Sequence, residues 1–138
     1  MKSVEPYLNF DGNTLEAFEF YRSVFGGEFN QKFTYADLGG GEPAPEDKDR
    51  IGHIGFEIAP GTFLMGSDVP AHGKDDFKLG TNVYINLNPE SMEEAKRLFD
   101  GLSAGGRVEM ELAKTGWADL YASFFDKFGV AWMINYNA

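Results

Sequence analysis

The stretch TGWADLYASFFDKFGVAWMINYN, residues 115–137, decides the fold, because it has two alternating runs of apolar and polar residues around the turn Lys127-Phe128-Gly129. An apolar residue at every second position is typical of a strand that is buried on one face. The two runs therefore predict a closing β-hairpin. Its apolar face comprises Leu120, Ala122, Phe124, Val130, Trp132 and Ile134, and its polar face comprises Asp119, Tyr121, Ser123 and Asn135.

An earlier stretch repeats this hairpin. IGHIGFEIAPGTFLMGSD, residues 51–68, also has two runs around a turn that ends in glycine, and the two stretches align when Gly129 is placed on Gly61. The repeat continues outside the hairpins, since YINL at residues 84–87 is similar to YLNF at residues 7–10. The order in each half is strand, helix and three strands, so the chain predicts two copies of one βαβββ module.

Shorter signals place the remaining elements. We expect strands at residues 3–10, 28–38 and 107–114, and helices at residues 15–25 and 91–104. A pair of glycines follows each helix, and glycine takes the left-handed conformation that ends a helix at little cost. The predicted buried positions are Ala17, Phe20, Tyr21 and Val24 in the first helix, and Met92, Ala95, Leu98, Phe99 and Leu102 in the second.

Composition limits the class of protein. The chain has 138 residues, 43% of them hydrophobic, which predicts a single domain. Within it, the repeat places module 1 at about 1–68, a connector at 69–80 and module 2 at about 81–138. A net charge of −10 argues against nucleic acid and anionic membranes as partners. The sequence has no membrane-length apolar run and no signal peptide, so we expect a cytoplasmic protein.

The segment GGGEPAPEDKD, residues 39–49, separates the second expected strand from the first hairpin. Its glycines, prolines and acids predict either a mobile loop or a lid over a site. Glu46, Asp47 and Asp49 lack the spacing of a calcium-binding loop, so we expect them to be solvated. His72, in the connector, is likewise expected to be a solvated loop residue.

The motifs PYLNFDGN, EAFEFYRSVFGG, IGHIGFEI, MGSD, AGGRV and DKFGVAWMIN together resemble the vicinal-oxygen-chelate superfamily of glyoxalases, bleomycin-resistance proteins and dioxygenases. They are most similar to its PhnB-like branch, which also carries a 3-demethylubiquinone-9 3-methyltransferase-like label. The resemblance covers essentially the whole chain. It implies an α+β fold of two tandem βαβββ modules that form a curled eight-stranded sheet around a cleft, and it implies a homodimer. It implies no single activity, because members include lyases, dioxygenases, thiol transferases and metal-free binders.

The family's metal positions carry unusual side chains in this sequence. In metal-dependent members, His, Glu or Gln ligands come from the first and last strand of each module, and the internal repeat places Tyr7, Tyr84, Met65 and Met133 there. A phenol would have to lose a proton whose reference pKa is about 10, and thioethers suit copper(I). We therefore expect no metal and no other cofactor, with a divalent metal held by other residues as the alternative.

Period two places polar and aromatic side chains together on the open side of the strands, where they would line the cleft. His53 and its repeat-mate Tyr121 are the candidates for catalytic proton transfer, and the structural alternative is a hydrogen-bonded ring in the cleft wall. A dyad of His53 and Glu57 is excluded, because four residues of strand span roughly 13 Å. The candidate ligand-binding residues are Tyr7, Asn9, Glu57, Met65, Tyr84, Asn86, Trp117, Asp119 and Met133.

Functions from different classes fit these observations. The first is a homodimer that binds a small organic molecule without a metal, and the acidic balance favours a neutral or cationic ligand. The second is a lyase, dioxygenase or transferase that acts on a small oxygenated or aromatic substrate, with His53 or Tyr121 in proton transfer. An assembly role through the dimer surface alone is a third. Tyrosine and methionine at the metal positions favour binding over catalysis.

Overall fold

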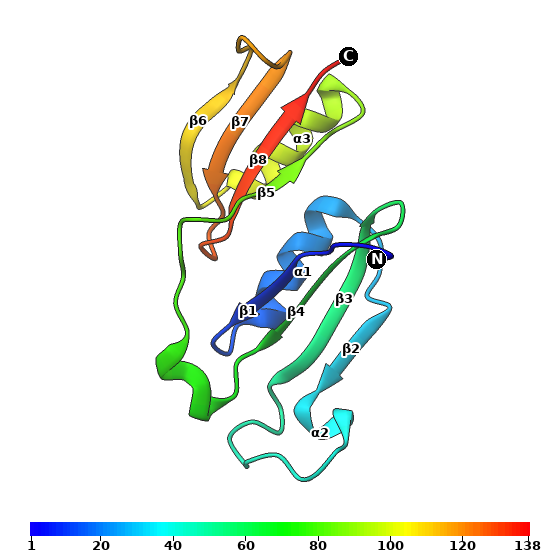
Figure 1. Ribbon diagram of the computed structural model, residues 1–138, viewed down its shortest axis with the longest axis vertical. Coiled ribbons are helices and arrows are strands. Elements are labelled where there is room, and N and C mark those ends of the chain that lie inside the picture. Colours follow the sequence, from blue (N-terminus) through cyan, green and yellow to red (C-terminus); the bar gives the residue numbers. More distant parts are fainter. The chain divides into compact units, whose positions relative to one another are not determined.

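The computed structural model describes residues 1–138, and its backbone contacts divide the chain into two units, Met1–Lys78 and Leu79–Ala138. Each unit contains one four-stranded sheet and a helix against it (Figure 1). Apart from two short helical segments in the first unit, the order of elements is strand, helix and three strands in both units, so the predicted duplication is confirmed. That the two modules form a single domain stays a prediction.

The first sheet has the strand order β1-β4-β3-β2. β1 (Tyr7–Phe10) runs parallel to β4 (Thr62–Asp68), which pairs antiparallel with β3 (Ile51–Ala59). β2 (Gln31–Thr34) forms the other edge. α1 (Thr14–Phe25) connects β1 to β2 and packs on one face of this sheet (Figure 1).

The second sheet repeats this order as β5-β8-β7-β6. β5 (Ile85–Leu87) is parallel to β8 (Ala131–Tyr136), while β7 (Leu120–Phe125) and β6 (Arg107–Ala113) continue the sheet antiparallel. α3 (Met92–Ser103) packs on one face, and the Ser91 side chain caps it by accepting from the Glu94 amide. The predicted α+β class is confirmed, with the eight strands divided between two sheets and not joined in one.

Two of the predicted buried helix positions are wrong. Phe20 of α1 is only half-buried, and Phe18 is fully buried in its place. The Phe18 ring packs over Gly66, and any side chain on Gly66 would clash with this ring. Met92 is 56% exposed, and it is the first residue of α3, three residues before the first buried position, Ala95. The other predicted stripe residues of α3 are buried.

The strand expected at residues 28–38 is shorter than predicted, since Tyr35–Leu38 forms a short helix, α2, after β2. Thr34 and Asp37 make a capping box, in which each side chain accepts from the other residue's backbone amide. The Thr34 amide, which donates to the Asp37 carboxylate, and the Thr34 side chain favour the charged form of the carboxyl and lower the pKa of Asp37. The local caps therefore stop the strand at Thr34.

The segment between α2 and β3 is held in place by hydrogen bonds near its carboxyl end. Asp47 is only 5% exposed, and its carboxylate accepts from the Ala71 amide at 2.9 Å. Arg50 donates to Asp11 at 2.9 Å and to the Val69 carbonyl at 2.8 Å. The prediction that Asp47 is solvated is therefore wrong, because this acid ties the segment to the chain that follows β4.

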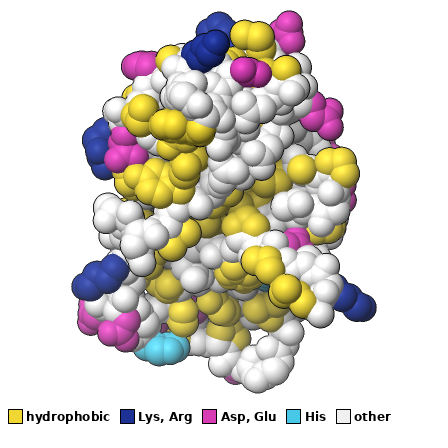
Figure 2. Space-filling view, turned by 45° about the horizontal axis from the view of Figure 1, so that its top comes forward, with side chains coloured by type: hydrophobic (Ala, Val, Ile, Leu, Met, Phe, Trp, Pro, Cys, Tyr) yellow, Lys and Arg dark blue, Asp and Glu magenta, His cyan; other side chains and the backbone are white.

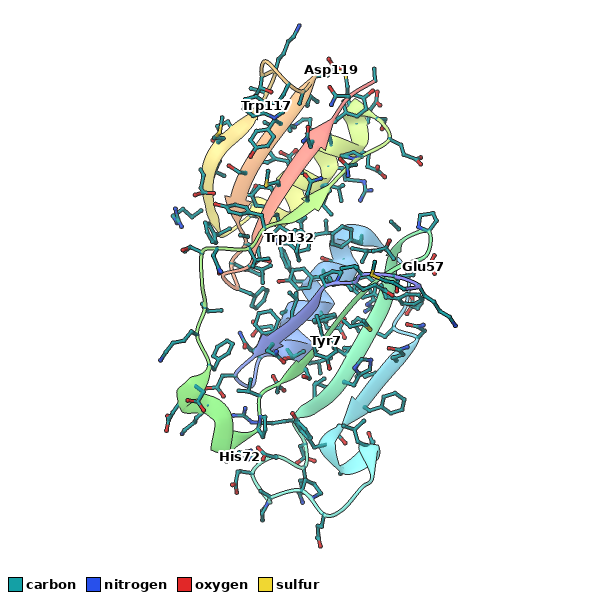
Figure 3. The ribbon with its side chains drawn as sticks, in the orientation of Figure 1. Tyr7, Glu57, His72, Trp117, Asp119 and Trp132 are labelled. Atoms are coloured by element: carbon teal, nitrogen blue, oxygen red, sulfur yellow. The ribbon has the colours of Figure 1, made fainter.

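The connector contains a 3-10 helix, η1 (Ala71–Asp76), which the sequence pattern did not predict. His72 lies exposed on η1, as expected for a solvated residue (Figure 3). No helix in the structure combines the length and the hydrophobicity that crossing a membrane requires.

Candidate functional site

The face of the first sheet that lies away from α1 carries the polar residues. In β3, Ile54 and Phe56 are fully buried on the helix side, so the intervening residues point to the opposite face. The strand register then places Met65 between Tyr7 on β1 and Gly55 on β3. Of the predicted site residues, this face brings together Tyr7, Asn9, His53, Glu57 and Met65.

Tyr7, His53 and Gln31 form a hydrogen-bonded chain across this face. Tyr7 Oη lies 3.1 Å from His53 Nδ1, and His53 Nε2 lies 2.6 Å from Gln31 Oε1. Because an amide oxygen only accepts, the hydrogen of the second bond belongs to Nε2, and Nδ1 of the neutral ring is an acceptor. In that tautomer the Tyr7 hydroxyl donates to Nδ1. The two rings are also close, with centroids 5.7 Å apart.

Gly55 leaves the space that Gln31 needs. The register places Gln31 opposite Gly55, and a Cβ on Gly55 would lie 3.0 Å from Gln31 Oε1 and 3.0 Å from Met65 Cγ. The carboxamide thus lies across the backbone of β3, which is a known use of glycine within a strand. Sequence reasoning missed Gln31, since only the register of β2 reveals that it faces a glycine beside a histidine.

Asn9 and Ser67 form a second polar pair on the same face. They are register partners, and Ser67 Oγ donates to Asn9 Oδ1 at 3.1 Å. Glu57 is exposed towards the far end of β3 (Figure 3). Both ring nitrogens of His53 are engaged by other residues, so Glu57 takes no part in the chain.

The second unit carries an aromatic pair in the corresponding place. Tyr121 is buried on the face of β7 away from α3, and Trp117 packs edge-on against it, with ring centroids 5.2 Å apart. Trp117 is itself 60% exposed, so it does not cap the core. Met133 on β8 lies between Ser123 on β7 and Asn86 on β5.

The register of β5 corrects one assignment from the repeat. Tyr7 opposes Met65 in the first unit, but the residue that opposes Met133 in the second unit is Asn86 and not Tyr84. The alignment of Tyr84 with Tyr7 is therefore displaced by two residues. A shift of two keeps every side chain on the same face, so alternation in the sequence cannot detect it.

Tyr84 belongs to a different cluster, at the start of β6. Its hydroxyl donates to Glu109 Oε1 at 2.6 Å, and this bond raises the pKa of Tyr84 because it requires the protonated phenol. Its ring lies 5.9 Å from that of Phe125, and the Arg107 guanidinium stands 4.5 Å from the same Phe125 ring.

Asp119 and Asn86 are exposed, and both have partners within their own unit. The Asp119 carboxylate accepts from the Ala138 amide at 2.9 Å, so it holds the end of the chain beside β7. Asn86 Nδ2 donates to Asn88 Oδ1 at 3.3 Å. Figure 3 places Asp119 and Trp117 at the same end of the second sheet.

The donors at the family's metal positions do not fit a hard or borderline divalent ion. Tyr7 commits its hydrogen to His53, and Met65 offers only a thioether. In the second unit the corresponding pair is Asn86 and Met133, an amide and a second thioether. The structure contains no group of three or more His, Asp or Glu side chains arranged to hold a metal ion.

Comparison with known proteins identifies the family. The sequence profile of the Glyoxalase/Bleomycin resistance protein/Dioxygenase superfamily matches residues 6–134, a range that includes nearly all of both sheets. The chain belongs to this superfamily. The fold and the family expected from the motifs are thus confirmed.

Several proteins are similar to this chain over almost its whole length. Protein YjdN of Escherichia coli (strain K12) is 35% identical over 141 residues, which cover 96% of this chain and 93% of YjdN. The crystal structure of PA1353 from Pseudomonas aeruginosa is 37% identical and covers 98% of both chains, with a TM-score of 0.82. A putative 3-demethylubiquinone-9 3-methyltransferase, PhnB protein, from Bacillus cereus shares the fold at 24% identity, with a TM-score of 0.75 over 98% of this chain and 99% of that one.

Proposed function

We propose that this superfamily member binds a small organic molecule on the polar and aromatic face of its first unit. The chain of hydrogen bonds from Tyr7 through His53 to Gln31 carries the proposal, because it presents ordered polar groups on an accessible sheet face. Tyr7 is 45% exposed, and Phe33, the register partner of His53, is 42% exposed. A few fixed polar groups beside aromatic surface are typical of small-molecule sites.

The charge of the protein supports a neutral or cationic ligand. The net charge is −10, so the field of the whole molecule repels anions. On the face itself Glu57 is the charged member of the predicted set, and it is exposed. The roles predicted for the second unit stay predictions. Tyr121 is the candidate for proton transfer, and the candidate ligand contacts are Tyr84, Asn86, Trp117, Asp119 and Met133.

The proposal includes the absence of a divalent metal from the family's positions and the pairing of two chains. Phenol, amide and thioether groups at these positions support the first part. Large apolar side chains that reach the surface support the second; Val83, Met110 and Trp117 are among them. Figure 2 shows hydrophobic side chains exposed on one face of the molecule. Light scattering at micromolar concentration should give the mass of a dimer, and the mass of a monomer would contradict it.

Metal analysis of the purified protein, combined with a thermal-shift series, tests the proposed function. We expect no stoichiometric metal and no stabilisation by divalent ions, whereas a panel of neutral and cationic organic compounds should include ones that raise the melting temperature. A ligand that binds only the folded state must stabilise it. A bound metal with a clear shift would contradict the metal-free proposal.

Variants locate the binding face. His53→Ala should abolish the shift given by an organic ligand while the fold is retained. Loss of the shift in Tyr121→Ala would separately support the contact predicted for the second unit. His72→Ala is the matched control, because His72 is the other histidine of the chain and is exposed on η1. Equal loss of binding in the His72 variant, or loss of the fold in His53→Ala, would contradict the assignment.

The same hydrogen bonds favour catalysis as a second candidate function. Tyr7 contacts an acceptor nitrogen of His53, so a proton that reaches the Tyr7 oxygen can be passed to the imidazole. This arrangement would suit a lyase, dioxygenase or transferase acting on a small oxygenated or aromatic substrate. Exchange of a ligand's acidic hydrogen for deuterium, dependent on His53, would support catalysis, and binding without exchange or turnover would support simple binding.

A further inference from the structure

We propose that Gln31 fixes the tautomer of His53, so that the Tyr7 oxygen faces the ligand as a hydrogen-bond acceptor and the site selects compounds with a hydroxyl group. This inference rests on the proposed function, since it concerns the same face of the first sheet. It adds a positioning residue, Gln31, and a class of ligand, neutral phenols and related hydroxyl compounds.

The first step concerns the imidazole. Gln31 Oε1 stands 2.6 Å from Nε2 of His53, and an oxygen of this kind holds the hydrogen on that nitrogen. Without such a partner, the neutral ring would exchange between its two tautomers. Gln31 can reach this place because Gly55, its register partner, has no side chain. The arrangement of β2 and β3 therefore sets the direction of the bond.

The second step concerns the Tyr7 hydroxyl. Nδ1 of the fixed tautomer has a lone pair, and Tyr7 Oη lies 3.1 Å from it, so the phenol hydrogen points at the ring. The oxygen then has only lone pairs to offer to a molecule that approaches from solvent. A ligand hydroxyl can donate to it, whereas a carbonyl, ether or carboxylate oxygen would meet a second acceptor.

The third step concerns the shape and charge of the ligand. Phe33 stands opposite His53, and Met65 stands opposite Tyr7, so an aromatic ring and a thioether lie on the same sheet face as the Tyr7 hydroxyl. Flat apolar groups pack well on such surfaces. The acidic protein disfavours anions. A neutral aromatic ring with one hydroxyl group can donate to the Tyr7 oxygen, can pack on these surfaces and is not repelled by the acidic protein.

The tautomer can be measured without any ligand. Long-range proton-nitrogen NMR spectra of the uniformly labelled protein at about pH 8, where a histidine with the reference pKa is neutral, should show His53 with its hydrogen on Nε2. Only two histidines contribute, and His72→Gln assigns the signals. Gln31→Met, which keeps the length but has no acceptor, should give a mixture of tautomers. Lys32→Ala, on the neighbouring exposed residue, should leave the tautomer unchanged.

Titration with two probes tests the selectivity. Phenol should bind roughly tenfold more tightly than anisole, in which the hydroxyl is methylated, because one net hydrogen bond separates them. Tyr7→Phe should remove this difference, Gln31→Met should reduce it, and chemical shifts of Tyr7, His53 and Phe33 should report the phenol.

The outcomes separate the two proposals. A wild-type His53 with its hydrogen on Nδ1, or with mixed tautomers, would overturn the role of Gln31 whatever binds. Equal affinity for phenol and anisole on this face would overturn the selection of hydroxyl compounds but leave the proposed binding function standing. If the tautomer is as expected and neither these probes nor any compound of the wider panel perturbs this face, the proposed function itself is overturned.

Discussion

Replacing Trp132 by alanine is expected to lower the free energy of unfolding by about 3 to 5 kcal/mol, the usual cost of deleting a large aromatic side chain from a core. Trp132 is fully buried near the start of β8, an interior strand of the second unit's sheet (Figure 3). Its indole Nε1 also donates to Asp126 Oδ2 at 2.9 Å. The substitution thus removes apolar packing and a buried hydrogen bond together.

Asp126 connects the Trp132 side chain to the turn between β7 and β8. The carboxylate is buried, and its other oxygen accepts from the amides of Phe128 and Val130 at 2.8 and 3.1 Å. In Trp132→Ala the carboxylate loses the indole donor while it stays away from water, which adds to the cost of the cavity. Trp132→Phe retains most of the packing, so it should lose less, about 1 to 3 kcal/mol.

Urea unfolding followed by far-ultraviolet circular dichroism measures these changes without relying on tryptophan fluorescence. Trp117→Ala is the matched control, because Trp117 is the other tryptophan of the chain and is mostly exposed. We expect it to change stability by less than about 1 kcal/mol. A similar loss in both alanine variants would refute the assignment of Trp132 to the core.

Asp68→Ala should cost nearly as much, about 3 to 5 kcal/mol, although the residue is a charged group at the end of a strand. Asp68 is buried, and its Oδ1 accepts from the amide of Gly12 at 3.0 Å and from both the amide and the hydroxyl of Thr14, at 3.0 and 2.6 Å. Its Oδ2 accepts from the Ile51 amide at 2.9 Å. One carboxylate thus holds the start of α1 against β3 and β4.

The cap explains why this side chain matters so much. Asn13 occupies the N-cap position of α1 but makes no side-chain capping bond, so Asp68 supplies the acceptor for the helix start from 54 residues away. A negative charge there also suits the helix dipole. In the alanine variant four donors lose their partner, and those that remain buried carry the full cost of desolvation.

Two variants calibrate the Asp68 measurement. Asp68→Asn keeps one acceptor oxygen of the same reach, so it should lose clearly less than Asp68→Ala. Asp75→Asn changes an exposed acid on η1 and should have almost no effect on urea unfolding. If Asp68→Ala unfolds at the same urea concentration as Asp75→Asn, the carboxylate does not hold α1 in place.

Patterns within short stretches predicted most of the fold. The alternation in residues 51–68 and 115–137 located both hairpins, and the repeat of their register revealed the duplicated module. The helices were placed to within a few residues by their apolar spacing and by the glycines that follow them. Where a local bond overrode the pattern, as the Thr34 capping box did after β2, the predicted element was wrong.

The candidate site was only partly predictable. Alternation placed Tyr7, His53 and Met65 on one face, because period two is a property of each strand alone. It could not show that Gln31 bonds to His53, or that Asn86 rather than Tyr84 stands beside Met133, since both facts depend on the pairing of strands far apart in the chain. The ligand contacts of both units stay predictions.

The sequence by itself determined the class of fold, the two modules and the faces of the strands, since these follow from periodicities of two and 3.6 residues that neighbouring side chains impose on the backbone. Tertiary structure alone decided the hydrogen-bond partners. Asp68 caps a distant helix, Asp47 is buried against the chain after β4, and Gln31 crosses a glycine to orient His53. Each of these bonds joins groups that the sequence separates by 20 residues or more, and only the folded register brings their atoms within 3 Å.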